Sequence, residues 1–258
     1  MTRLIALVTA LIALPLSAAT LETNGVVVPL GAAPQILIPA AGSTAGANGT
    51  FFRSDITLIN FGDVPQQVHM QWLPQAGGSS TTADVILPAR TGMTSEDFVT
   101  QFLGVQGLGS ILISGETSSE AFDPSAKLYA TSRIWTPQPV TGGTTSQSLD
   151  VVPPGTTMIS RAAIFGLRRD SRYRANVGIV NLDSSATLTF VITASPNGDV
   201  YTVTVPPLSM QQVSLTASST AISQITIATG APSLWLAYGS SIDNVSGDAW
   251  SELALPSQ

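Results

Sequence analysis

The sequence contains no cysteine and a single histidine, and only 10% of its 258 residues are charged. The lack of cysteine excludes disulfide bridges, a lipid-modified N-terminal cysteine and thiolate metal sites. The single histidine leaves little material for acid–base catalysis at neutral pH or for a transition-metal centre. Because an average soluble protein has about 25% charged residues, most of the polar surface has to come from uncharged side chains such as Ser, Thr, Asn and Gln.

Residues 1–19 have the pattern of a secretory signal peptide. Arg3 precedes an apolar run from Leu4 to Leu14, and Ser17-Ala18-Ala19 supplies small residues for cleavage before Thr20. The apolar run is shorter than the roughly 20 residues that cross a bilayer as a helix. We therefore predict a bacterial protein that is secreted or extracytoplasmic, in the periplasm or outside the cell, with no membrane span after signal cleavage.

The rest of the chain contains two copies of one pattern. Residues 52–60 align without a gap on residues 173–181, with an aromatic residue and Arg first, an alternating apolar run next and Asn last. A second match joins residues 130–134 to residues 238–242. Such an internal repeat predicts two tandem domains. We place the first domain at residues 20–155 and the second at residues 156–258.

Apolar and polar residues alternate with a period of two in both copies, which predicts an all-β fold. Strands are predicted at 55–60, 67–72, 83–87 and 110–113 in the first copy, and at 176–181, 187–193, 201–205, 211–215 and 224–227 in the second. One short helix is predicted, capped by Thr94 or Ser95 and ending at Gly104. The pattern therefore favours two antiparallel β-sandwich domains in tandem.

Three segments carry a family resemblance. Residues 48–60, residues 132–135 followed by Gly143, and residues 242–244 followed by Gly247-Asp248 resemble the repeat signatures of uncharacterised exported bacterial proteins built from tandem immunoglobulin-like β-sandwich modules. The resemblance implies an immunoglobulin-like fold for each domain and an extracytoplasmic location. It brings no catalytic or binding residues with it.

Half of the ten basic residues are concentrated in one short stretch at the start of the second domain. They are Arg161, Arg168, Arg169, Arg172 and Arg174. Clustered guanidinium groups can bind phosphates or carboxylates. Residues 20–155 hold ten acidic and four basic residues, so we expect the cluster to contact this first domain or a neighbouring subunit. An external anion is the alternative, and the oligomeric state stays open.

Other candidate sites rest on single residues. Trp135 and Trp250 are candidates for stacking on a sugar or a partner protein, whereas Trp72 and Trp235 lie in apolar strands and are expected to be core residues or interface anchors. His69 alternates with apolar residues in the same way as Gln67 and Gln71, so it is expected to face solvent without a catalytic role. Residues 243–248 have oxygen ligands for calcium but lack the EF-hand pattern, so a polar turn is favoured and no metal or cofactor is predicted.

These observations favour a non-enzymatic exported protein of the structural, surface or adhesion type, which mediates protein or glycan contacts. A carbohydrate-binding accessory module is the alternative, and a hydrolase comes third because no nucleophile motif is present. With 16 acidic against 10 basic residues, general nucleic-acid binding is not expected.

Overall fold

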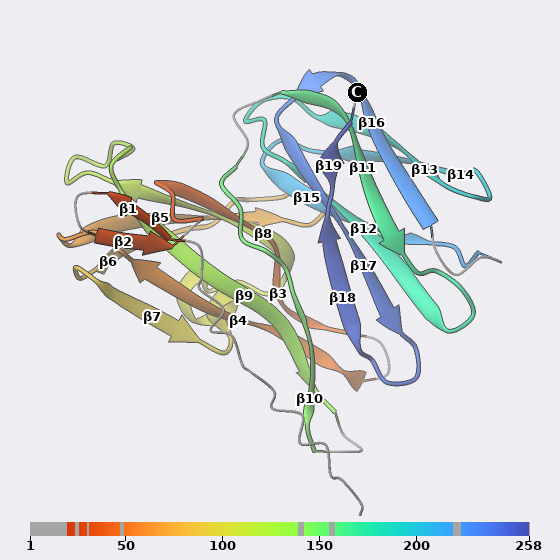
Figure 1. Cartoon of the computed structure of the whole chain (residues 1–258), viewed down its shortest axis with the longest axis horizontal. Helices are drawn as coiled ribbons and strands as arrows, with labels where there is room; N and C mark the ends of the chain where they lie inside the picture. The colour runs from red at the N-terminus through yellow and green to blue at the C-terminus, as the bar shows by residue number, and fades with distance from the viewer. Residues whose placement is uncertain are drawn as a thin grey trace, which may run out of the picture. The chain divides into compact units, whose positions relative to one another are not determined.

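The protein is all-β and contains several antiparallel sheets (Figure 1). The computed structural model describes residues 20–23, 26–29, 31–46, 49–138, 142–154, 158–218 and 223–257. The predicted signal peptide lies outside these residues, so its prediction stands untested. Among the described residues, no helix has the length and apolar character needed to cross a membrane. The all-β prediction is confirmed.

The chain divides into two compact units, one within residues 1–30 and one formed by residues 31–258. In the first, strand β1 (Thr20–Thr23) pairs antiparallel with β2 (Val26–Pro29). The second unit holds all the remaining strands and includes both of the predicted repeats.

The described part of the first predicted repeat contains eight strands and one short helix. The strands are β3 (Gln35–Ala45), β4 (Phe51–Asn60), β5 (Gln66–Pro74), β6 (Thr82–Leu87), β7 (Thr91–Ser95), β8 (Gly107–Glu116), β9 (Leu128–Pro137) and β10 (Thr144–Ser148). They form one sheet in the order β10-β9-β4-β3-β8-β5-β6, and β7 also pairs with β4. A short pairing of β3 with β4 at residues 43–45 and 51–53 joins the two parts of this sheet.

The described part of the second predicted repeat contains nine strands in two sheets. They are β11 (Ile159–Leu167), β12 (Tyr173–Asn181), β13 (Leu188–Ala194), β14 (Asp199–Val205), β15 (Ser209–Leu215), β16 (Ser223–Ser233), β17 (Trp235–Asp243), β18 (Ala249–Leu253) and β19 (Leu255–Pro256). The sheet orders are β14-β13-β16-β11-β19 and β15-β12-β17-β18.

The same strand pairings occur in both halves of this unit. β4 pairs with β7 and β9, as β12 pairs with β15 and β17. β5 pairs with β6 and β8, as β13 pairs with β14 and β16. Asn60 lies opposite Leu128, and Asn181 lies opposite Trp235. This register makes residue 130 equivalent to residue 237, whereas the sequence match aligned residue 130 with residue 238.

Each half has its own hydrophobic core, on either side of the predicted boundary at residue 155. The first includes Ile56, Met70 and Ile113, and the second includes Val177, Phe190 and Ile225. Their side chains come from alternate positions of neighbouring strands, because successive residues of a strand point to opposite faces. Burial of these alternate apolar residues explains the period-two pattern in the sequence.

A third core joins the two halves. It contains Leu37, Ala40, Leu73, Leu149, Val180, Met210 and Tyr238, and all of them are buried. The backbone crosses the same boundary, since Ala76 N donates to Met210 O at 2.9 Å. Strand β3 is buried along most of its length because Ile36 and Ile38 face the first core while Leu37 and Ala40 face the shared core.

Tyr238 reaches the shared core by lying across Gly178. A Cβ atom on Gly178 would come within 2.1 Å of the Tyr238 ring, which is closer than any side chain can approach. The Tyr238 hydroxyl bonds Gln212 Oε1 at 3.1 Å, and burial raises the pKa of this phenol. The Gly178 position, which is Thr57 in the first repeat, is therefore a packing requirement.

The predicted short helix is present but begins later than expected. It is the π-helix η2 (Val99–Leu103), which buries Val99 and Leu103 in the first core and ends at Gly104 with a left-handed φ of 66°. Ser95 belongs to strand β7 and bonds Gln101 Oε1 at 2.6 Å. The pairing of β7 with β4 as far as Ser95 leaves only the last part of the predicted segment free to form a helix.

Candidate functional site

Arg169 is fully buried, at 0% exposure, although the sequence placed it in a basic contact surface. Its guanidinium donates to Ser223 Oγ at 2.9 Å, to Asp199 Oδ2 at 2.6 Å and to the carbonyl of Thr216 at 2.8 Å. A buried cation needs such partners because it has lost its hydration. These partners all lie in the second half, so none of them belongs to the first domain, with which the sequence had favoured a contact.

Three other arginines of the cluster lie before or at the start of strand β12, beside the β17–β18 turn. Arg172 pairs with Asp243 at 2.9 Å, and Arg174 donates to Asn244 Oδ1 at 2.9 Å. Arg168 is exposed and lies over two aromatic rings, 5.2 Å from the Tyr173 centroid and 5.9 Å from that of Trp250. These contacts all fall within the second half of the chain.

Arg161, the remaining member, is exposed on β11, where its carbonyl accepts a hydrogen bond from Ser257 N. The cluster therefore divides into one buried residue, one isolated residue and a group at the turn. Its described ionic partners, Asp199 and Asp243, both follow residue 155. The acidic first half does not supply them, and the described contacts between the halves are the shared apolar core and uncharged hydrogen bonds such as that from Gln147 Nε2 to the Trp250 carbonyl at 3.2 Å.

Asp243 is saturated by protein donors, which explains the turn that it begins. Its Oδ1 accepts from Val245 N at 2.8 Å and Ser246 N at 3.3 Å, and its Oδ2 faces Arg172. The backbone donor at Val245 and the Arg172 guanidinium lower the pKa of Asp243, and Asp243 in turn raises the pKa of Arg172. The geometry is that of a polar turn whose carboxylate is paired with the Arg172 guanidinium.

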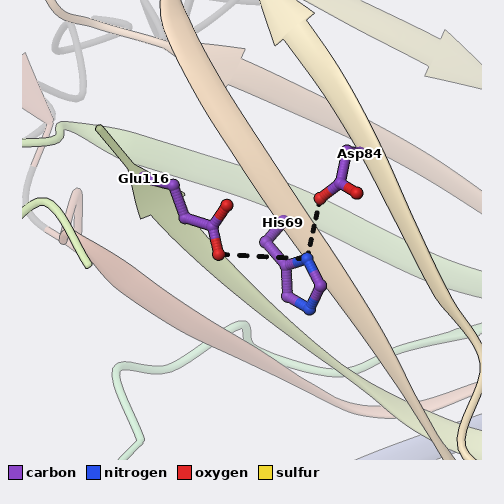
Figure 2. Close-up of side chains that lie close together, drawn as sticks. All are labelled: His69, Asp84 and Glu116. Atoms are coloured by element: carbon purple, nitrogen blue, oxygen red, sulfur yellow. Dashed lines mark hydrogen bonds and ion pairs between the residues drawn. The ribbon is translucent and has the colours of Figure 1, made fainter. Parts of the chain in front are cut away.

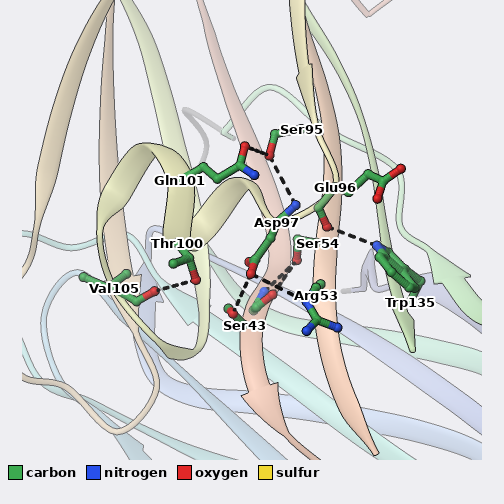
Figure 3. A network of polar contacts seen from close by, with 11 residues as sticks. Ser43, Arg53, Ser54, Ser95, Glu96, Asp97, Thr100, Gln101, Val105 and Trp135 are labelled. Atoms are coloured by element: carbon green, nitrogen blue, oxygen red, sulfur yellow. Dashed lines mark hydrogen bonds and ion pairs between the residues drawn. The ribbon is translucent and has the colours of Figure 1, made fainter. Parts of the chain in front are cut away.

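The two candidate tryptophans are half-buried and engaged by other side chains. Trp135 donates its indole N–H to the Glu96 carbonyl at 3.1 Å, and the Arg53 guanidinium lies 5.8 Å from its ring (Figure 3). Trp250 meets Tyr173 edge to face, with the ring centroids 5.6 Å apart. Arg168 also lies over the Trp250 ring. Each indole ring therefore already has a guanidinium over it, where a sugar would have to stack. Trp72 and Trp235 are buried in the cores, as predicted.

Arg53 is part of a polar network beside η2 (Figure 3). Its Nε lies 3.7 Å from Asp97 Oδ2, which also accepts a hydrogen bond from Ser43 Oγ at 3.2 Å. The network connects β3, β4 and the segment that leads into the helix.

A compact group of ionisable side chains lies on the solvent face of the first sheet, and the sequence did not predict it. His69 Nδ1 is 2.7 Å from Asp84 Oδ1 and 3.9 Å from Glu116 Oε1 (Figure 2). The three residues come from the neighbouring strands β5, β6 and β8. Their side chains are 30%, 57% and 16% exposed, respectively.

Strand register brings this group together. His69 lies directly opposite Asp84, and Glu116 lies opposite Gln67, two residues before His69 on the same face. The even spacing of Gln67, His69 and Gln71 did predict that His69 lies on the polar face. Sequence reasoning could not find its partners, because they depend on which strands are neighbours.

Comparison of the chain with known protein families, curated proteins and solved structures found no match in any of the three.

Proposed function

We propose that this protein is a non-enzymatic, exported β-sandwich protein that binds a partner protein through the open edges of its sheets. The observation that carries the proposal is that β6 and β14 are edge strands. In the described part of the chain, each is paired on one side only and ends its sheet. Each also exposes a β-branched apolar side chain, Ile86 at 71% and Val200 at 63%.

An open strand edge can add a strand from another polypeptide through main-chain hydrogen bonds. Many proteins block such edges with charged side chains or proline. Here the outward side chains of β14 include Val200, Thr202 and Thr204, and those of β6 include Ile86 beside Asp84. Because the two strands take the same place in the two halves, one chain offers two equivalent edges.

The shared core supports a structural or adhesive role. It joins the halves by buried apolar side chains, so that a load applied to one half would be transmitted to the other.

The signal-peptide pattern supports export, and the sequence resemblance supports immunoglobulin-like modules. In both halves, however, the seventh strand pairs with the second, whereas the immunoglobulin sheets group strands A, B, E and D against C, F and G.

The carbohydrate-binding alternative has less support. Sugar binding by stacking needs an accessible aromatic face, and Arg53 and Arg168 lie over Trp135 and Trp250. A glycan contact remains an outcome of the experiment below.

The proposal is tested by measuring the binding of purified protein to intact cells of the bacterium that exports it. We expect binding that is lost after protease treatment of the cells and after Ile86→Lys with Val200→Lys, because charge on the edges opposes strand addition. Val245→Lys is the matched control, since Val245 is exposed in a turn and not on an edge.

Two results would overturn the proposal. One is binding that survives protease treatment but is abolished by glycosidases, which would establish a glycan ligand. The other is a native protein that is retained in the cytoplasm with residues 1–19 still attached.

A further inference from the structure

We propose that His69, Asp84 and Glu116 form a binding site for a divalent transition-metal cation of the Zn²⁺ type. Each residue offers a ligand atom, and these atoms all lie within 4.8 Å of one another. The three side chains converge on one point of the sheet face (Figure 2). The proposal does not depend on the partner-binding function, although one of its ligands, Asp84, lies on the edge strand β6.

The distances suit a metal after small side-chain movements. Ligand atoms at the usual zinc distances and tetrahedral angles lie about 3.4 Å apart. The two separations from His69 Nδ1, 2.7 Å and 3.9 Å, lie on either side of this value. Asp84 and Glu116 can adjust by rotation about their side-chain bonds, while the paired strands hold the three backbones in place.

The ligand set indicates the class of metal. Imidazole nitrogen suits zinc and neighbouring transition metals, whereas calcium and magnesium prefer oxygen ligands alone. Two carboxylates supply the negative charge that a divalent cation needs. Three protein ligands also leave a coordination position for water.

The fold does not need this group of residues. In the first half, Asp84 lies three residues before the end of edge strand β6 and pairs with His69. In the second half, Thr202 lies three residues before the end of edge strand β14 and pairs with Val191. The sheet there has the same pairings without an ionisable side chain at this place. The three ligands are therefore a feature of the first half alone, as expected for a binding site added to a shared framework.

The single histidine makes a direct test possible. In protein purified without a histidine tag, every imidazole signal in a magnetic resonance spectrum belongs to His69. Addition of Zn²⁺ should shift these signals until one equivalent is bound. Competition with a chromophoric chelator then gives the dissociation constant for Zn²⁺.

Loss of a ligand should weaken Zn²⁺ binding by at least about tenfold, a cost already seen when outer-shell partners of metal ligands are removed. This expectation covers His69→Gln, Asp84→Asn and Glu116→Gln. Asp63→Asn removes the same charge from an exposed position paired with Arg90 and should leave affinity unchanged. Calcium should not displace Zn²⁺.

The proposal fails if saturating Zn²⁺ leaves the imidazole signals unmoved, or if His69→Gln binds Zn²⁺ as well as the parent protein does. Equal loss of affinity in Asp63→Asn would also overturn it, because the effect would then come from net charge. Folding of each variant is checked by its unfolding curve without metal.

Discussion

At the scale of single residues, Asn60 and Asn181 have the same role in the two halves. Asn60 Nδ2 donates to the carbonyls of Val64, Leu87 and Pro88, and its Oδ1 accepts from Gly62 N. Asn181 Nδ2 donates to the carbonyls of Ala186, Val205 and Pro206, and its Oδ1 accepts from Asp183 N. Both side chains are buried, and each ties the end of one strand to the end of a second.

We predict that Asn60→Ala and Asn181→Ala each lower the free energy of unfolding by about 2 to 3 kcal/mol, because buried carbonyls lose their donor. Urea unfolding followed by tryptophan fluorescence measures the change. Asn176→Ala is the control: this residue accepts a single hydrogen bond from Ser214 Oγ, so its loss should cost about 0.5 kcal/mol or less. A cost as small as this at Asn60 or Asn181 would contradict the prediction.

At the scale of structural elements, the β17–β18 turn depends on an ionised carboxylate. Asp243 is buried, and its two oxygens are occupied by backbone N–H groups and by Arg172. These donors lower the pKa of Asp243 below its usual value of 3.8. Asp183 forms a similar turn, in which the N–H groups of Ala186 and Ser185 lower its pKa.

A pKa that is lower in the folded than in the unfolded protein stabilises the fold above the unfolded pKa, and this stabilisation is lost as the pH falls through the folded pKa. We predict that Asp243→Asn destabilises the protein at pH 7 and that the difference from the parent protein shrinks below about pH 4. Thermal unfolding of both proteins from pH 7 to about pH 2 measures this difference in stability.

Asp248→Asn is the matched control for the pH experiment, because Asp248 lies in the same turn but is exposed. Its difference from the parent protein should stay small throughout. A difference for Asp243→Asn that is constant with pH would show that its carboxylate charge has no part in the turn.

At the scale of the whole compact unit, apolar burial and not charge joins the two halves. The shared core includes Leu73 from the first half and Met210 from the second, both fully buried. The exposed arginines Arg168 and Arg172 have their contacts within the second half. This arrangement replaces the ionic contact that the charge asymmetry had suggested.

We predict that Leu73→Ala or Met210→Ala lowers the free energy of unfolding by about 2 to 5 kcal/mol, the usual cost of a cavity in a core. The same substitution should separate the unfolding of the halves into two calorimetric transitions with little dependence on salt. Arg168→Ser with Arg172→Ser should leave one transition. Separation of the halves by the arginine variant alone, most clearly at low ionic strength where charges are least screened, would restore an ionic interface.

The sequence by itself determined the all-β class and the polar face of His69, because burial on one face leaves a period-two pattern. It also predicted β4, β5, β6 and β8 in the first half and β12 to β16 in the second, but not the bounds of β9 and β17, which lie inside their sheets. It did not predict β3, since apolar residues that face two different cores leave no alternation. It also gave no sign that Arg169 is buried, because its partners, Asp199 and Ser223, lie far along the chain.

The tertiary structure alone decided which distant residues meet. His69, Asp84 and Glu116 come together only because β5 lies between β6 and β8 in one register. Likewise, the apolar residues of the shared core cannot be told from those of the separate cores by their pattern, since hydrophobic burial has no direction. Local sequence specifies each strand and its faces, whereas strand order and register determine the candidate site.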